Sequence, residues 1–360
     1  MIEGYFRRRA LKLILAVLTA SSILIYLSVS NSSTISNIHF YVYKHFRLDN
    51  DDEQLPKTFD QSREENLVES KDKGFLSTIG FINSPYLNLE PIRSSNVLIL
   101  MILSKATNIE VRDAIRRTWG FNRQYRNDET RIRLFFVVGT EDLMIQRIQM
   151  EQIVFDDIIQ VTIPDLFSFV AYKEIAAMKW MRTYLPEKQF YFKTEDYVIL
   201  NMNTFIHSFV PLIENVAQQE LVIGWFGTEH LVQRGKYQKF DNVTEHSSNN
   251  GIMYATNFLY AITSTAVDRI LRILDQIELI EYPGDPFVTG ILRDAAGVKI
   301  INLPNISTEL TYELANGACT AALKKNQKLL VCTTSLYIGS KNSMYEYFDA
   351  WNILIGQRSN

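Results

Sequence analysis

The sequence predicts an α/β domain, a mainly parallel sheet with helices on both faces, preceded by one transmembrane helix and a flexible stem. Three observations predict this architecture. A basic cluster precedes an apolar run near the N-terminus, a polar stretch follows, and apolar strand-length runs then alternate with helical stretches. Strands that are apolar throughout are typical of parallel sheets covered on both faces. The predicted parts are listed in chain order: a cytoplasmic tail (1–12), an anchor (13–29), a lumenal stem (30–92) and a folded domain (93–360).

The anchor follows from the apolar run 13–29 and the basic cluster from Arg7 to Lys12 that precedes it. As a helix this run is about 26 Å long, close to the roughly 27 Å core of an ER-type bilayer. The next Lys or Arg is Lys44, so the positive-inside bias places the N-terminus in the cytoplasm and the remainder in the lumen. A cleaved signal peptide is the alternative, but its apolar region would be shorter and no A-x-A site follows. The short span favours the thin Golgi membrane.

The segment 30–92 has the composition of a solvated stem. Between Asp49 and Lys73 there are nine acidic and four basic residues, without sustained apolar periodicity. Such a stretch buries too little apolar surface to order itself. We therefore expect a spacer that holds the folded domain away from the membrane.

Two further features agree with a lumenal location. N-x-S/T sequons begin at Asn31, Asn242 and Asn305. Asn31 lies close to the membrane, so Asn242 and Asn305 are the predicted glycosylation sites. Cys319 and Cys332 either pair in the oxidising lumen and close a short loop, or remain two free buried thiols.

The folded domain shows alternating strands and helices. Apolar strands are expected at 97–103, 133–139, 158–163 and 190–193. Helical spacing is found at 110–118, 142–154 and 167–184. Ligands bind such sheets outside the carboxyl ends of the strands. No GxGxxG follows the first strand and no GxxxxGK[ST] occurs, so dehydrogenase and P-loop interpretations lose their main support.

The composition excludes other classes of protein. Lys plus Arg is 37 and Asp plus Glu is 40, and this net charge of -3 argues against a nucleic-acid binder. Two cysteines are too few for a disulfide-stapled mini-protein or a cysteine-only zinc module. The five histidines show no HxH or HExxH spacing, which argues against a zinc hydrolase.

Three groups of polar residues are candidates for a site. Glu195 and Asp196 directly follow a strand, where carboxylates can hold a divalent cation that neutralises phosphate. Asp285 is the single acid among Pro, Gly and apolar neighbours, and turn capping is its alternative role. Arg112 and Arg116 share one face of a predicted helix and meet either phosphate or salt-bridge partners.

Taken in order, these segments resemble the beta-1,3-galactosyltransferase family, which includes beta-1,3-N-acetylglucosaminyltransferases. Segment 112–120 (RDAIRRTWG) matches that family's RxAIRxTWG almost letter for letter. The looser matches are LFFVVG at 134–139, DDIIQ at 156–160 with Asp165 and Lys173 after it, KTEDYV at 193–198 in the place of KxDDDV, Gly224-Trp225, and 285–290 in the place of DVxxG within EDVxxG. The resemblance covers about residues 93 to 300.

The resemblance implies a type II Golgi transferase with a GT-A fold. It implies transfer of galactose or N-acetylhexosamine from a UDP-sugar to a hydroxyl of a glycan acceptor, with inversion and a β-1,3 linkage. Mn²⁺ on Glu195 and Asp196 would bind the diphosphate, and Asp285 would be the catalytic base. The implied donor-binding residues are Arg112, Arg116, Lys173, Thr194, Glu195 and Asp196.

Departures from the family pattern bear on activity. Tyr197 stands at the last acid of KxDDDV, and Tyr is a poor ligand for a hard cation. Gly284 replaces the Glu of EDVxxG, and 251–260 lacks the prolines and glycines of YPPYxSGxGY. A catalytically silent lumenal domain that binds a glycan or a partner transferase is therefore the second hypothesis. The sequence fixes neither the sugar nor whether the chain forms a homo-oligomer.

Overall fold

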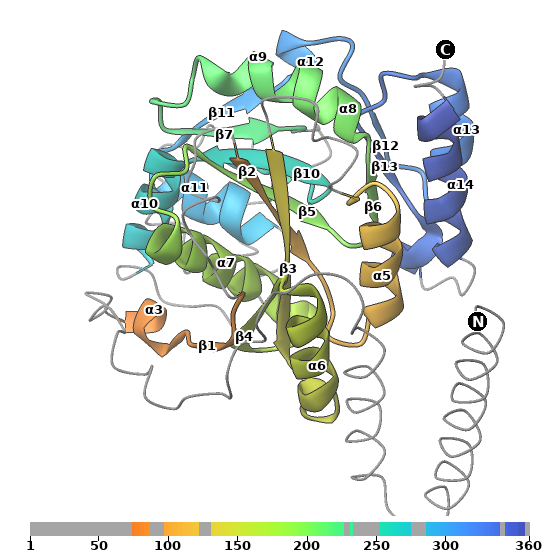
Figure 1. Cartoon of the computed structure of the whole chain (residues 1–360). Coiled ribbons are helices and arrows are strands. Elements are labelled where there is room, and N and C mark those ends of the chain that lie inside the picture. Colours follow the sequence, from red (N-terminus) through yellow and green to blue (C-terminus); the bar gives the residue numbers. More distant parts are fainter. Residues whose placement is uncertain are drawn as a thin grey trace, which may run out of the picture. The chain divides into compact units, whose positions relative to one another are not determined.

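The structure is a computed structural model. The residues it describes belong to one compact unit, Ser70–Asn360 (Figure 1). They are 74–85, 97–121, 131–226, 231–232, 252–274, 286–338 and 343–356. Among them no helix has the length and apolar character needed to span a bilayer. The predicted anchor at 13–29 lies outside the described residues, as do Asn242 and Asp285.

A mixed eight-stranded sheet lies at the centre of this unit, in the order β1-β4-β3-β2-β5-β10-β7-β11 (Figure 1). Its strands are β1 (Phe81–Asn83), β2 (Val97–Leu103), β3 (Arg131–Thr140), β4 (Ile158–Pro164), β5 (Phe190–Glu195), β7 (Leu221–Gly224), β10 (Leu259–Thr263) and β11 (Lys299–Asn302). Neighbours from β4 to β5 are parallel, as are β7 and β11. β10 runs antiparallel between β5 and β7, and β1 antiparallel to β4. All strands except β1 and β10 therefore run in the same direction, which agrees with the predicted mainly parallel sheet.

Helices cover both faces of the sheet, as predicted. Strand β2 shows why its sequence is apolar throughout: Leu100 and Ile102 enter one core, whereas Ile99, Met101 and Leu103 enter the other. The first core lies under α5 (Ile109–Arg117), α6 (Ile145–Phe155) and α14 (Ser343–Gly356). The second core lies under α7 (Val170–Tyr184), α10 (Ser264–Ile273) and the π-helix η7 (Phe287–Leu292).

The elements expected between 97 and 193 agree with the structure within two residues at each end. The helix predicted at 142–154 consists of the 3₁₀-helix η3 (Asp142–Met144) and α6, and that at 167–184 of η4 (Phe167–Phe169) and α7. The remaining elements are α3 (Gly74–Thr78), α8 (Met202–Thr204), η5 (Phe205–Phe209), α9 (Val210–Glu214), β8 (Leu231–Val232), β9 (Ile252–Met253), α11 (Arg293–Ala295), α12 (Leu303–Ile306), α13 (Cys319–Lys325) and η8 (Ser335–Ile338).

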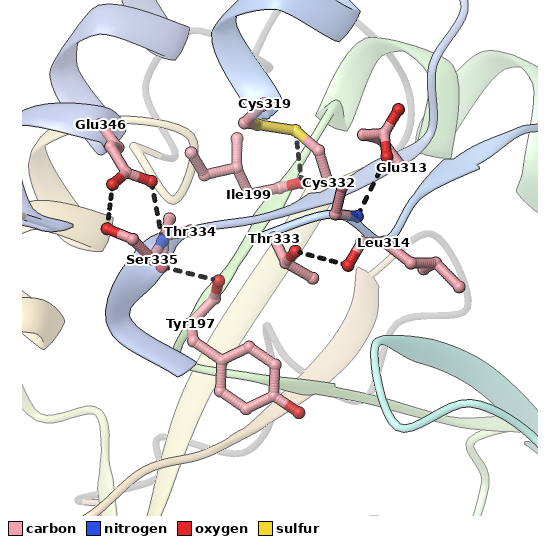
Figure 2. The surroundings of a disulfide bond; sticks show 11 residues. Tyr197, Ile199, Glu313, Leu314, Cys319, Cys332, Thr333, Thr334, Ser335 and Glu346 are labelled. Carbon is pink, nitrogen blue, oxygen red and sulfur yellow. Dashed lines mark hydrogen bonds between the residues drawn. A yellow bond between two sulfur atoms is a disulfide. The ribbon is translucent and has the colours of Figure 1, made fainter. Parts of the chain in front are cut away.

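A small sheet, β12 (Tyr312–Glu313), β13 (Val331–Thr333) and β6 (Val198–Leu200), lies beside the main one. The structure has a disulfide between Cys319 and Cys332, whose Cα atoms are 5.1 Å apart, so α13 is tied to β13 (Figure 2). Just after β13, Thr334 donates from its backbone N at 2.9 Å and its Oγ1 at 3.0 Å to the carbonyl of Tyr197. This arrangement fixes the backbone where β5 ends.

The folded unit begins earlier than the predicted stem boundary at residue 92. Helix α3 and strand β1 precede that boundary, and β1 pairs antiparallel with β4. Leu76 and Ile79 are buried, and Lys179 of α7 donates to both of their carbonyls. The carboxyl end of the stem prediction is therefore wrong. The strand β1 has only three residues, which is too short for an alternating pattern to be recognised in the sequence. It is ordered by its pairing with β4, which the sequence pattern does not show.

Candidate active site

A cavity of about 340 Å³ lies at the carboxyl ends of β2 and β5. This is the edge at which sheets with parallel strands bind ligands. One wall is polar and includes Ser104, Lys173 and Asp196. Other parts of the lining are apolar and include Phe167 and Leu336. A cavity with both kinds of lining suits a ligand that has an apolar or ring face and a charged group.

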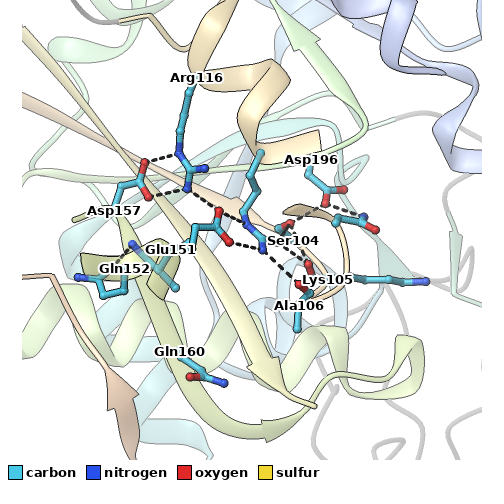
Figure 3. Close-up of polar contacts among 12 residues, drawn as sticks. Ser104, Lys105, Ala106, Arg116, Glu151, Gln152, Asp157, Gln160 and Asp196 are labelled. Carbon is cyan, nitrogen blue, oxygen red and sulfur yellow. Dashed lines mark hydrogen bonds and ion pairs between the residues drawn. The ribbon is translucent and has the colours of Figure 1, made fainter. Parts of the chain in front are cut away.

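Asp196 is fixed by contacts from two elements. Its Oδ2 accepts from Ser104 Oγ at 2.7 Å and from Asn108 Nδ2 at 2.9 Å (Figure 3). The Tyr347 hydroxyl of α14 donates to its backbone carbonyl. Asn108 is the N-cap residue of α5, but its side chain makes no cap and contacts Asp196 instead. The loop after β2 therefore positions the carboxylate that follows β5.

Glu195 forms an ion pair with Lys193, which does not line the cavity. Lys193, which is 1% exposed, donates to Glu195 Oε1 and also to the carbonyl of Asn257 at 3.0 Å. Burial raises the pKa of Glu195 to about 7; the charge of Asp196 adds to this, and Lys193 opposes it.

Lys173 closes the floor of the cavity. Its Nζ donates to the carbonyl of Ser104 at 2.7 Å and to Asp165 Oδ1 at 2.8 Å. The other oxygen of Asp165 accepts from the backbone N of Ala106. The predicted residues Lys173, Glu195 and Asp196 therefore line one cavity, together with Asp165.

Arg112 is not available to a donor phosphate, contrary to the prediction. Its side chain is 0% exposed, and its five N–H groups are all used. It forms a two-point pair with Glu151, at 2.8 and 2.7 Å, and donates to Ser104 Oγ and to the carbonyls of Lys105 and Ala106 (Figure 3). Arg112 therefore supports the cavity from below and does not line it.

Arg116 also lies elsewhere. It pairs with Asp157 and Glu151 and stacks between the rings of Phe136 and Phe155, 4.8 and 4.0 Å from their centroids. Burial alone would lower the pKa of Arg116, but its hydrogen bonds and attraction to Asp157 and Glu151 raise it. It lines a separate cavity of about 610 Å³ and not the cavity that holds Asp196.

Thr194 is a further correction. Lys193 and Glu195 point to one face of β5, so the residue between them points to the other. Thr194 is 0% exposed and donates to the carbonyl of Phe258 at 2.5 Å. It holds β5 beside the segment leading into β10 and does not line the cavity.

The manganese site implied by the resemblance does not fit these residues. Glu195 is committed to Lys193, and one oxygen of Asp196 already accepts two hydrogen bonds. Tyr197 adds no carboxylate, and its ring packs edge-on against Phe258 at 5.9 Å. Across the part of the chain that is described, no three His, Cys, Asp or Glu side chains are grouped to hold a metal.

Several cavity residues were not singled out from the sequence. Ser104, Lys105 and Asn108 follow directly after β2, and their place at a strand's carboxyl end is the signal that marks them. Phe167 follows the carboxyl end of β4 in the same way, whereas Asn257 had no such signal, because it comes from the segment before β10.

Comparison with known proteins gives the family. The family model described as galactosyltransferase matches residues 110–304, more than half of the chain. The chain belongs to the galactosyltransferase family. This match confirms the resemblance inferred from the motifs.

Curated relatives in this family are distant. UDP-GalNAc:beta-1,3-N-acetylgalactosaminyltransferase 1 of Homo sapiens is 23% identical over 209 residues, 56% of this chain and 61% of that protein. UDP-GlcNAc:betaGal beta-1,3-N-acetylglucosaminyltransferase 7 of Rattus norvegicus is 25% identical over 214 residues, 56% of this chain and 52% of that protein. The chain thus spans less than two thirds of the length of these relatives. The solved structure of galactosyltransferase LgtC aligns with a TM-score of 0.39 and 9% identity, over 72% of this chain and 96% of that one.

Proposed function

We propose that this protein is a hexosyltransferase that moves galactose or N-acetylhexosamine from a UDP-sugar to a glycan acceptor hydroxyl, with inversion and a β-1,3 linkage. The observation that carries the proposal is the cavity at the carboxyl ends of β2 and β5, with Asp196 held in place at its polar wall. Two family relatives compared above are transferases whose names state UDP-GalNAc or UDP-GlcNAc.

The polar and the apolar residues that line the cavity have separate tasks in this proposal. The polar wall, with Lys173 and Asp196, receives the charged and hydroxyl groups of the donor. Phe167 is 67% exposed at the apolar part of the lining, where its ring offers a stacking face to a base or sugar. Leu166, its neighbour in the chain, is 57% exposed and lines the same cavity, so the exposed apolar surface there is not that of Phe167 alone.

The catalytic base in this proposal is Asp285. The residues that follow it support the assignment. Phe287 is buried, and its ring centroid lies 5.9 Å from that of Tyr172. Tyr172 precedes the cavity residue Lys173 in the chain. Thr289 Oγ1 accepts from the backbone N of Ala255, close in the chain to the cavity residue Asn257. The segment after Asp285 thus packs against elements that line the cavity.

One spacing favours the second candidate function, a catalytically silent domain that binds a glycan, a nucleotide sugar or a partner transferase. In EDVxxG the Asp lies four residues before the Gly, whereas Asp285 lies five before Gly290. Counted back from Gly290, the position of that Asp is held by Pro286. Tyr197 and Pro286 thus both stand at positions where the family pattern has an acid.

A donor screen tests the proposal. The full-length protein in detergent is incubated with UDP-galactose, UDP-GalNAc or UDP-GlcNAc and glycan acceptors, and UDP release is measured. We expect acceptor-dependent release with one of these donors. Binding of UDP without transfer to any acceptor would favour the silent domain, and no binding of UDP would contradict both.

The proposed location is the Golgi membrane, as a single-pass type II protein with the folded domain in the lumen. Asn305 is exposed on α12, so its sequon is accessible in the folded unit. We expect N-glycosidase to increase the mobility of the cellular protein, and Asn305→Gln to remove part of that shift. Ser307→Ala breaks the same sequon and should act alike. An unchanged wild-type mobility would contradict the lumenal assignment of this face.

A further inference from the structure

A nucleoside diphosphate carries negative charge that its binding site must meet with positive charge or directed N–H groups. We propose that this cavity binds the diphosphate of its donor without a divalent metal ion, with Lys105 and the amino end of α5 supplying the positive charge. The inference rests on the proposed function, since it concerns the same cavity.

The carboxylates of the cavity are already committed to protein groups. Asp165 takes the Lys173 ammonium and a backbone N–H, and Glu195 takes the Lys193 ammonium. Asp196 takes a hydroxyl and an amide on one oxygen. A metal ion would have to displace these donors, and leaving a buried ammonium unpaired is costly. Internal ammonium groups therefore occupy Asp165 and Glu195, and two neutral donors occupy one oxygen of Asp196.

Lys105 is the cation of the cavity that remains exposed. Its backbone is held, because Arg112 Nη1 donates to the Lys105 carbonyl at 2.5 Å. Its neighbour Ser104 contacts Asp196. Figure 3 shows the Lys105 side chain extending away from Arg116 and Glu151. A fixed backbone with a projecting ammonium is suited to contact phosphate at the cavity.

The amino end of α5 adds a second positive feature. Asn108 is its N-cap residue and lines the cavity, yet its side chain bonds to Asp196 and leaves the first-turn amides uncapped by it. Amides at a helix amino end favour an anion, through their N–H groups and the helix dipole. Glu110 in the first turn is exposed and offsets part of this field.

Calorimetric titration with UDP tests the inference on the full-length protein, in EDTA and in excess Mn²⁺. We expect the two dissociation constants to agree within about threefold. Lys105→Ala should weaken UDP binding about 10- to 100-fold in EDTA, as for loss of a charged hydrogen bond. Lys105→Arg should keep the affinity, and Lys299→Ala, an exposed lysine at the other end of the sheet, is the matched control.

Tyr197→Asp supplies the converse test. It adds next to Asp196 a carboxylate that is not paired with a protein cation, so we expect Mn²⁺ to strengthen UDP binding in this variant and not in the wild type. Tenfold weaker UDP binding by the wild type in EDTA, restored by Mn²⁺, would overturn the inference and leave the proposed function standing. Unaltered affinity in a folded Lys105→Ala protein would overturn the role of Lys105. Absence of UDP binding in every condition would overturn both proposals.

Discussion

Replacing Arg112 by alanine is expected to lower the free energy of unfolding by about 3–5 kcal/mol. The guanidinium is 0% exposed and satisfies Glu151, Ser104 Oγ and two backbone carbonyls at once. Its removal leaves those acceptors buried, with Arg116 as the remaining partner of the Glu151 carboxylate. Together the arginines lower the pKa of Glu151 against the effect of burial, so their contacts favour its charged form. Denaturant unfolding of the purified protein measures the loss.

The matched control is Arg117→Ala on the same helix. Arg117 pairs with Asp113 at 3.0 Å, but its side chain is 67% exposed. Pairs of this kind contribute about 0–1 kcal/mol. Arg112→Lys keeps the charge but not the five donors, and should lie between the two. A folded Arg112→Ala protein of unchanged stability that no longer binds UDP would instead show that Arg112 contacts the donor.

The RxAIRxTWG segment shows what sequence reasoning reached and what it missed. The motif identified the family correctly, yet the residues of the motif stabilise the fold and do not line the cavity. Trp119 is 1% exposed, and a Cβ on Gly120 would lie 2.7 Å from a side-chain atom of Leu134. Spacing along α5 predicts that Arg112 and Arg116 share a face. It does not reveal that this face meets Glu151, which comes from another helix.

Local pattern predicted the central strands well, because a strand buried on both faces must be apolar at every position. It also placed Glu195 and Asp196 at a strand end, where the cavity is found. The alternation of side chains along β5 would have excluded Thr194 from the site. The sequence pattern could not predict pairing between distant segments, such as β1 with β4. It also could not predict the ion pairs of Glu195 and Arg112, because these depend on tertiary contacts.

Asp285→Asn is expected to reduce turnover about 10²- to 10⁴-fold, the usual contribution of a positioned general base. The amide keeps the shape of the side chain and loses its basicity. The acceptor hydroxyl must lose a proton as the glycosidic bond forms, so chemistry should fail while UDP binding persists. Steady-state transfer, UDP affinity and thermal unfolding are measured on the same preparation, with Asp113→Asn on the exposed face of α5 as the matched carboxylate-to-amide control.

The three measurements separate the roles open to Asp285. A base affects the rate alone, whereas an Asp that merely caps a turn affects the melting temperature. A second variant, Pro286→Asp, tests the assignment further. When the family pattern is aligned on Gly290, Pro286 stands at the position of its Asp. If Asp285 is the base, Pro286→Asp should not restore transfer to an Asp285→Asn protein. Restored transfer in that double variant would move the base to position 286, and near-wild-type transfer by Asp285→Asn would remove Asp285 from the chemistry.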